Sequence, residues 1–119
     1  MFSGGSENSS AALEWAMTEL VRNPRAMKKA QAELRGALKG KSKIEEKDIE
    51  GMSYLSAVVK EAMRTHPPGT LFPRESRERC VIAGYEIPAK TKVVVNVWAI
   101  ARDPNYWTEA ESFKPERFL

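Results

Sequence analysis

Apolar residues recur at helical spacing in three stretches of the first half of the chain. The first stretch predicts a helix over residues 9–22, and Ser9 or Ser10 can cap its start. Asn23 and Pro24 end this helix and begin the next, because proline disfavours a helical conformation in the residue before it and is well placed at a first helical position. The apolar faces consist of residues three or four apart: Leu13, Ala16, Met17 and Leu20 in the first helix, and Met27, Ala30, Leu34 and Leu38 in the second.

A third stretch predicts a helix that Ser53 can cap and that His66 and two following prolines end. Gly40 can end the second helix. The segment 41–50 between these two helices is charged and loop-like, with one short helical turn expected near 46–49. The third helix has a wide apolar face, formed by Tyr54, Leu55, Val58, Val59, Ala62 and Met63.

The second half of the chain has the shorter period of β-strands. Residues 79–82 form a short β-prone run before a turn at 83–85. Residues 91–98 have the strongest strand pattern, because β-branched side chains dominate it. We expect an apolar linker at 69–72 and a further turn at 103–105.

Helices followed by a small β region indicate an α+β fold in which helix dominates. Within one partial domain covering 1–119, we expect a helical part at 1–65, a linker and β region at 66–98, and a turn and meander at 99–119. The chain opens on a Gly-Gly stretch and stops without a tapering tail, which is typical of an excerpt from a longer protein.

The charges of the chain exclude some function classes. The 19 basic residues are interleaved with 16 acidic ones, for a formal net charge of +3, which argues against a nucleic-acid-binding stripe. The basic face of the second helix is interpreted as a solvated surface. No apolar run reaches about 18 residues and the first residues lack the pattern of a signal peptide, so we expect neither a membrane span nor a targeting segment in this chain.

Cys80 and His66 are the single cysteine and the single histidine. One cysteine excludes an internal disulfide, and so few soft ligands argue against a zinc or iron site made of protein alone. Any metal chemistry would therefore need a cofactor. We interpret His66 as a packing and turn residue without a ligand partner.

Glu61 and Arg64 lie one turn apart on the same face of the third predicted helix. The motif is weak by itself: Glu-x-x-Arg also occurs at Glu19 and Arg22, and about one copy is expected by chance. Only the context of each copy can separate them.

The context of Arg64 is an ordered series of further motifs. After the helix-ending prolines come Pro73-Arg74-Glu75, the 81–85 hairpin, Ile87-Pro88, the strand to Trp98, Arg102-Asp103-Pro104, Trp107 and Pro115-Glu116-Arg117-Phe118. This series resembles the cytochrome P450 family, in particular the plant microsomal enzymes of specialised metabolism. The resemblance covers essentially the whole chain. It implies the end of the long helix over the haem, two further long helices, a small β region and the meander of that fold.

The resemblance implies a buried ion triad of Glu61, Arg64 and Arg117, in which two guanidiniums saturate one carboxylate and lock the core that faces the haem. Removing one member would leave buried charge unpaired, at a cost of about 3–5 kcal/mol. A structural role is therefore expected rather than a catalytic one.

The resemblance also implies that Arg74 pairs with a haem propionate. The neighbouring residues that match the lining of the substrate pocket are Thr70, Leu71 and Phe72. From the residues alone, Arg74 could instead form an ion pair with Glu75 or Glu78.

The first residues match the long helix over the haem, where a small residue makes room for oxygen and an acid beside a hydroxyl relays protons. The matching residues are Gly4, Gly5, Glu7 and Asn8. Asn8 departs from the family pattern, because an amide donates hydrogen bonds but does not relay a proton as a hydroxyl does. Ser9 or water could take that part. Without the resemblance, residues 3–10 would be interpreted as a flexible start before a helix.

By resemblance, a cysteine thiolate in a loop beyond Leu119 ligates the iron of haem b. Cys80 lies in a β-prone run and is not that ligand, so we expect no iron ligand in this chain. The family further implies O2 and NADPH-derived electrons as co-substrates, an NADPH-dependent reductase as partner and a small hydrophobic substrate. It also implies the cytosolic face of the endoplasmic reticulum membrane, reached through an N-terminal anchor that is absent from this chain.

The expected function is therefore part of a haem-dependent monooxygenase that inserts one atom of O2 into a small hydrophobic organic substrate. The chain alone is expected to be inactive, because it lacks the thiolate. The alternative is a truncated, non-enzymatic interaction fragment. A basic nucleic-acid binder is a weaker third hypothesis, because the charges are interleaved.

Overall fold

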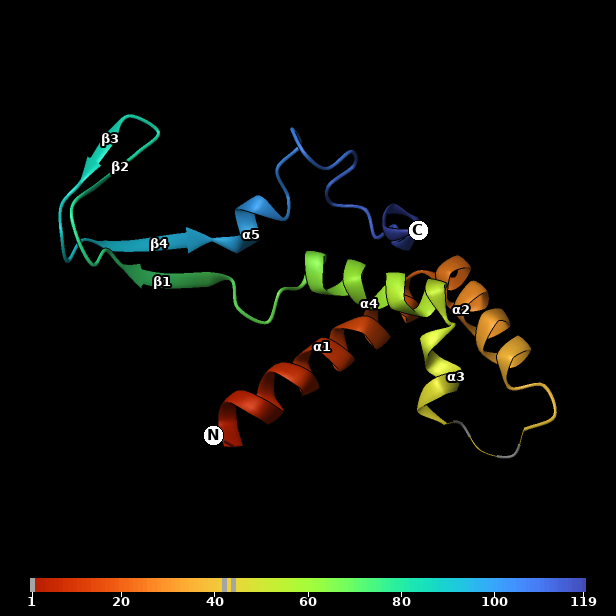
Figure 1. The fold of residues 1–119 in the computed structure, drawn as a ribbon. Coiled ribbons are helices and arrows are strands. Elements are labelled where there is room, and N and C mark those ends of the chain that lie inside the picture. Colours follow the sequence, from red (N-terminus) through yellow and green to blue (C-terminus); the bar gives the residue numbers. More distant parts are fainter. Residues whose placement is uncertain (1, 42, 44) are drawn as a thin grey trace.

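The computed structural model describes residues 2–41, 43 and 45–119 (Figure 1). Helices come first and a small β region follows: α1 (Phe2–Arg22), α2 (Pro24–Ala37), α3 (Glu46–Glu50), α4 (Ser53–Thr65), β1 (Leu71–Glu75), β2 (Cys80–Ile82), β3 (Tyr85–Ile87), β4 (Lys92–Asn96), α5 (Val97–Ile100) and the 3-10 helix η1 (Pro115–Phe118). This order confirms the expected α+β fold in which helix dominates. No helix in the described ranges combines the length and the apolar character needed to cross a membrane.

The first helix begins earlier than the apolar spacing predicts. Residues 2–10 are helical, so the expected cap at Ser9 or Ser10 is wrong. The hydroxyl of Ser9 instead donates to the carbonyl oxygen of Gly5, at 3.2 Å, one turn earlier in the same helix. A serine inside a helix commonly makes this backbone contact, and it does not interrupt α1.

Asn23 separates α1 from α2 in a different way from the one expected. It does occupy the N-cap position of α2, but its side chain makes no capping hydrogen bond there. The amide nitrogen Nδ2 donates to the carbonyl oxygen of Glu19, at 2.8 Å, and this carbonyl near the end of α1 also accepts the backbone amide of Asn23, at 2.9 Å.

The start of α4 is capped by a residue of another helix. Ser53 was the expected N-cap but is the first helical residue, after Met52. The carboxylate of Glu33 on α2 accepts the backbone amides of Tyr54 and Leu55, at 2.9 and 2.8 Å, and the hydroxyl of Ser53, at 3.3 Å. One side chain of α2 therefore binds amides that α4 leaves unpaired.

The core lies where α1, α2 and α4 meet. Its buried members come from these three helices and are Leu20, Ala26, Ala30, Tyr54 and Val58, with Met27 and Phe113 packed against them. Other positions on the expected apolar faces are exposed: Leu13 and Met17 on α1, and Val59 and Met63 on α4.

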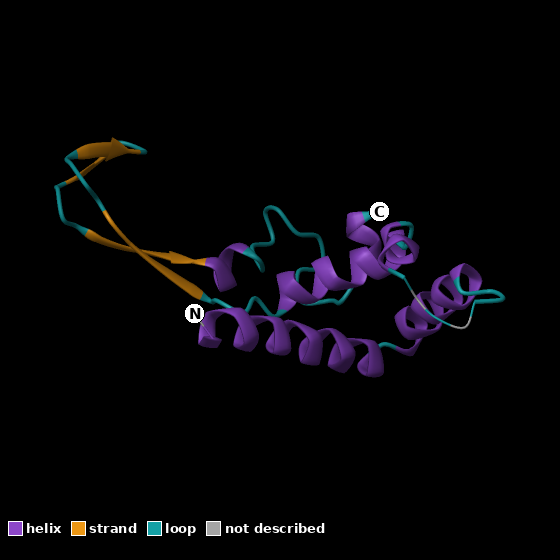
Figure 2. Ribbon diagram, turned by 60° about the horizontal axis from the view of Figure 1, so that its bottom comes forward, coloured by secondary structure: helices purple, strands orange, loops and turns teal. Residues whose placement is uncertain are grey.

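The chain is elongated. Its radius of gyration is 18.7 Å and its extents are 61 × 36 × 22 Å, whereas a compact domain of this length has a radius near 13.5 Å, about 2.2 N^0.38. Figures 1 and 2 show the reason: the strands project from the helices as a separate arm. Much of the apolar surface of α1, α4 and this arm has no partner within the described residues.

The arm consists of two antiparallel pairs. β1 pairs with β4, from Leu71 opposite Asn96 to Glu75 opposite Lys92, and β2 pairs with β3. Ala83 and Gly84 connect β2 to β3 with φ angles of 50° and 85°, and two positive φ angles in a row are typical of the tightest hairpin turns.

Two expectations for this region are wrong. Residues 71 and 72 of the expected linker belong to β1, where they pair with β4. The expected strand at 91–98 ends at Asn96, because the side chain of Asn96 accepts the amide of Ala99, at 3.0 Å, and caps α5. The turn at 103–105 is confirmed: the amide of Tyr106 donates to the carbonyl oxygen of Asp103, at 3.1 Å.

Candidate functional site

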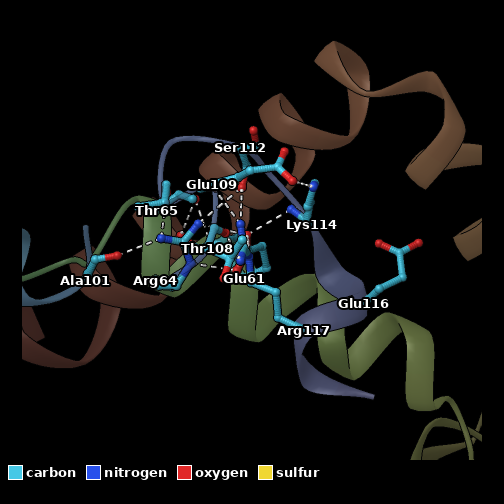
Figure 3. Close-up of polar contacts among 12 residues, drawn as sticks. Glu61, Arg64, Thr65, Ala101, Thr108, Glu109, Ser112, Lys114, Glu116 and Arg117 are labelled. Carbon is cyan, nitrogen blue, oxygen red and sulfur yellow. Dashed lines mark hydrogen bonds and ion pairs between the residues drawn. The ribbon is translucent and has the colours of Figure 1, made fainter. Parts of the chain in front are cut away.

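A cluster of charged groups is buried between α4, the 101–114 segment and η1 (Figure 3). Its centre is the carboxylate of Glu61, which is 0% exposed. Arg64, one turn later on α4, donates from Nε to Oε2 at 2.7 Å and from Nη2 to Oε1 at 2.8 Å. This two-pronged geometry is the strongest that an arginine and a carboxylate can form.

Arg64 also binds the backbone of the segment that follows α5. Its Nη1 donates to the carbonyl oxygens of Ala101 and Ala110, at 2.6 and 2.8 Å, and its Nη2 donates to that of Ser112, at 3.3 Å. With the two bonds to Glu61, all five N–H groups of the guanidinium have partners. The guanidinium also lies 5.1 Å from the centre of the Trp107 ring.

Arg117 completes the cluster from η1. Its Nε donates to Oε1 of Glu61 at 3.2 Å, and its terminal nitrogens donate to the carbonyl oxygens of Thr108 and Glu109. The backbone amide of Lys114 adds a fourth donor to Glu61, at 2.8 Å. The structure thus brings together the three residues that were expected to form a triad.

The geometry of this cluster indicates a structural role rather than a catalytic one. A carboxylate that accepts four hydrogen bonds and is shielded from water has no free position from which to exchange a proton with a substrate. The two guanidiniums bind five carbonyl oxygens of residues 101–112, which would otherwise need water. The cluster therefore holds an irregular segment against α4.

A second group of charges borders the cluster at Glu116. Its carboxylate is bound by Arg25 and Lys29 of α2, at 3.2 and 3.3 Å, and accepts the hydroxyl of Tyr54 at 3.3 Å. Burial disfavours the ionised form of Glu116, but hydrogen bonds from its own amide and from Lys29, with the charges of Arg25 and Lys29, outweigh burial and lower its pKa. Burial, followed by the charge of Glu116 and the hydrogen bond to it, raises the pKa of Tyr54.

The expected substrate-lining residues lie at the start of the arm. Leu71 and Phe72 are in β1, and the carbonyl oxygen of Thr70 accepts the amide of Trp98, at 3.3 Å. A Cβ added at Gly69 would lie 2.9 Å from the ring of Phe72. The Phe72 ring therefore occupies its position because residue 69 has no side chain.

Arg74 follows on β1 and is exposed. Its Nη1 donates to the carbonyl oxygen of Pro73, at 2.9 Å, and its guanidinium lies 5.6 Å from the Phe72 ring centre. In the described part of the chain no ion pair joins Arg74 to Glu75 or Glu78, the alternative that the residues alone left open. Its remaining donors can bind an external carboxylate.

The expected oxygen-activating residues lie near the beginning of α1. Gly4, Gly5, Glu7 and Asn8 are helical, and the last three are exposed. A Cβ at Gly5 would meet nothing within 4 Å. Figure 1 shows this end of α1 and the arm extending toward the same end of the molecule, away from α2 and η1.

Cys80 is a partly buried free thiol in β2, on the arm. Within the described ranges, no three His, Cys, Asp or Glu side chains gather as they would around a metal ion.

The sequence did not predict the contact between Glu19 and His66. His66 Nε2 lies 2.9 Å from Oε1 of Glu19, a buried carboxylate that also accepts Asn23 Nδ2 at 3.1 Å and pairs with Arg22 at 3.3 Å. The ring of Trp15 stacks on that of His66, with centres 3.9 Å apart and planes 3° apart. Glu19 belongs to the second Glu-x-x-Arg copy, and these contacts give His66 a hydrogen-bond partner in addition to the packing and turn role expected of it.

Comparisons with known proteins agree with the resemblance. The sequence model described as Cytochrome P450 matches residues 1–119. Germacrene A hydroxylase of Barnadesia spinosa is 61% identical over 119 residues, which are 99% of this chain and 24% of that protein. Melianol synthase CYP71BQ17 of Ailanthus altissima is 59% identical over 118 residues, 99% of this chain and 23% of that protein. The chain thus spans about a quarter of the length of these curated relatives.

Solved structures extend the likeness to three dimensions. A zebra fish cytochrome P450 solved with progesterone superposes with a TM-score of 0.92 at 34% identity, over 99% of this chain and 28% of that chain. A zebra fish cytochrome P450 solved with abiraterone superposes with a TM-score of 0.93 at 34% identity, over 99% of this chain and 29% of that chain. A family match over every residue, high identity to plant relatives and a shared fold lead to one conclusion: this chain belongs to the cytochrome P450 family.

Proposed function

We propose that the protein containing this chain is a haem-dependent monooxygenase that inserts one atom of O2 into a small hydrophobic substrate. The observation that carries the proposal is the 61% identity, over 99% of this chain, to a protein named as a hydroxylase. Family membership by itself implies haem iron, and NADPH-derived electrons that arrive through a reductase.

Arg74 supports the haem part of the proposal. The haem propionates are carboxylates. The guanidinium of Arg74 lies on an exposed strand and uses Nη1 to bind the carbonyl oxygen of Pro73, and its other N–H groups can bind a carboxylate through two parallel hydrogen bonds. We assign Arg74 to a propionate. When bound, the haem supplies the activation of molecular oxygen. Its iron ligand is not assigned to Cys80, which lies on the arm in β2.

Thr70, Leu71 and Phe72 are assigned to the substrate pocket. Leu71 and Phe72 expose apolar surface, 57% and 42% of each residue, next to Arg74 in the same strand. A hydrophobic substrate held here would lie close to the group that Arg74 binds. The contacts expected of these side chains are apolar packing, which excludes water from the substrate.

Gly4, Gly5, Glu7 and Asn8 are assigned to oxygen activation. The open space around Gly5 leaves room beside the helix. Glu7 can move a proton, while Asn8 can only donate and accept hydrogen bonds, so proton delivery depends on Glu7, water and neighbouring hydroxyls. The hydroxyl of Ser9 already donates its hydrogen to the carbonyl oxygen of Gly5, so its oxygen remains in this turn of α1 as an acceptor.

Glu61, Arg64 and Arg117 are assigned a structural role. They fix the 101–117 segment on α4, and α4 leads directly into the linker before β1. We place the whole protein at the endoplasmic reticulum membrane, as the resemblance to the family implies. A polypeptide limited to these 119 residues should not hydroxylate, because its single thiol is Cys80.

The test is oxygen incorporation by the full-length protein. The protein is incubated with NADPH, a plant NADPH-dependent reductase, isotopically labelled O2 and germacrene A, the compound named for the relative from Barnadesia spinosa. We expect one labelled oxygen atom in the product, lost when NADPH is omitted. A panel of related hydrocarbons that yields no labelled product, from a protein that carries haem, would refute monooxygenation.

A further inference from the structure

His66 joins two regions that the sequence places 47 residues apart. It is the residue after α4, and it lies against α1 through two independent contacts. One is the hydrogen bond to Glu19; since a carboxylate only accepts, His66 Nε2 carries the hydrogen. The other is the parallel stack on Trp15, four residues before Glu19 on the same helix.

Glu19 is well suited to hold His66 in place. Only 6% of the residue is exposed, so its carboxylate depends on protein donors. Asn23 supplies one donor at 3.1 Å, and Arg22, at 3.3 Å, has a side chain that is 67% exposed. The shortest contact of the carboxylate is that with His66, at 2.9 Å.

The backbone after His66 is restricted, so the position of His66 constrains that of Gly69 and Thr70. Two prolines follow, each with its φ angle fixed near −65°, and each also restricts the residue before it. Few backbone torsions are therefore free between His66 and Gly69. At the far end the amide of Trp98 binds the carbonyl oxygen of Thr70, and Gly69 admits the ring of Phe72.

We propose that His66 is a positioning residue for the substrate segment. Clamped between Trp15 and Glu19 of α1, it sets where Thr70, Leu71 and Phe72 lie, and thereby the affinity and regioselectivity for the substrate. This inference rests on the proposed function for its consequence in catalysis. The clamp and its effect on the linker concern the fold alone.

The test uses the full-length protein loaded with haem and compares three variants. His66→Phe keeps a ring for Trp15 but removes the donor to Glu19. His66→Gln restores a donor of similar reach without the ring. Arg22→Gln is the matched control, because it removes an exposed partner of Glu19 and leaves the contacts of His66 with Glu19 and Trp15 in place.

The first readout is hydrogen exchange of the backbone amides of Gly69, Thr70, Leu71 and Trp98. Loss of a hydrogen bond to a buried carboxylate should accelerate exchange at these sites by about tenfold in His66→Phe, whereas His66→Gln and Arg22→Gln should stay within about threefold of the wild type. Unchanged exchange in His66→Phe would overturn the proposal. Acceleration spread evenly over the whole molecule would also overturn it, because it would mean general destabilisation.

The second readout is the spectral response of the haem to germacrene A. We expect His66→Phe to keep the carbon monoxide band of the wild type but to bind the probe about tenfold more weakly, with partial rescue in His66→Gln. Equal affinity in wild type and His66→Phe contradicts the proposal. A wild type without a carbon monoxide band refutes the proposed function instead. The hydrogen-exchange comparison then still tests whether the contacts of His66 with Trp15 and Glu19 position residues 69–71.

Discussion

The guanidinium of Arg64 binds the carboxylate of Glu61 with two nearly equal hydrogen bonds, of 2.7 and 2.8 Å, and both groups are buried. The same carboxylate holds Arg117, so one acidic group neutralises part of the charge of two guanidiniums. A buried pair is weak evidence for net stability, because desolvation opposes the attraction, but the loss of one member is costly.

We expect Glu61→Ala to lower the free energy of unfolding by about 3–5 kcal/mol, because it leaves Arg64 and Arg117 without their counter-charge. Chemical denaturation of the full-length protein measures the change. Glu86→Ala is the control, since the Arg79–Glu86 pair on the arm is more than 60% exposed on both sides, and such pairs contribute little. Equal losses in the two variants would contradict a special role for the buried cluster.

Arg64→Lys tests geometry separately from charge. Lysine keeps the positive charge but has three donors on one nitrogen, whereas Arg64 reaches the carbonyl oxygens of Ala101, Ala110 and Ser112 as well as Glu61. We expect Arg64→Lys to destabilise the protein by at least about half as much as Arg64→Ala, because buried carbonyls lose their donors. A stability within about 0.5 kcal/mol of the wild type would show that charge alone suffices.

Glu33 provides a third prediction, at the start of α4. Its carboxylate accepts two backbone amides and the hydroxyl of Ser53, which is the work of an N-cap. We expect Glu33→Ala to cost about 1 kcal/mol in unfolding free energy, and Ser53→Ala to cost less, because the amides of Tyr54 and Leu55 keep Glu33 in that variant. If Ser53→Ala proves the more harmful of the two, the hydroxyl is the true cap.

Much of the helical region could be predicted because its signals are local. The breaks at Pro24 and after Thr65, and the spacing of Ala16, Leu20 and Val58, depend on neighbours within a few residues. The extent of α1 could not be predicted, because glycines and serines favour loops unless tertiary contacts decide otherwise. The strand β1 was missed because Pro73 interrupts its pattern, and a two-stranded sheet, in which every strand is an edge, tolerates that proline.

The residues of the site were also predictable only in part. The resemblance identified Glu61, Arg64 and Arg117, and the structure brings them within hydrogen-bonding distance. The clamp of His66 could not be read from the chain, because Glu19 is 47 residues away and no local pattern connects them. Glu33 was missed for a similar reason: a cap that comes from another helix has no fixed spacing to the amides that it binds.

A pH dependence follows from Glu116. Its pKa in the folded protein is below the ordinary 4.5, so its stabilising contribution is complete above pH 4.5 and is lost as the pH falls through the lower folded value. We expect the stability difference between wild type and Glu116→Gln to shrink on going from about pH 6 to about pH 3. Denaturation curves at several pH values measure it.

Tyr54→Phe is the control for this pH series, because it removes one contact of Glu116 but leaves Arg25 and Lys29 in place. The stabilising contribution of Glu116 should therefore still be lost at low pH in Tyr54→Phe. A difference between wild type and Glu116→Gln that stays constant across the acid range would contradict the lowered pKa.

We propose that the protein containing this chain is a haem-thiolate monooxygenase. The most direct measurement is the absorption spectrum of the full-length protein, reduced and exposed to carbon monoxide. We expect the strongly red-shifted Soret band of a haem whose iron is bound by a cysteine thiolate. A preparation that binds haem but shows only the band of imidazole-ligated haem would contradict the account.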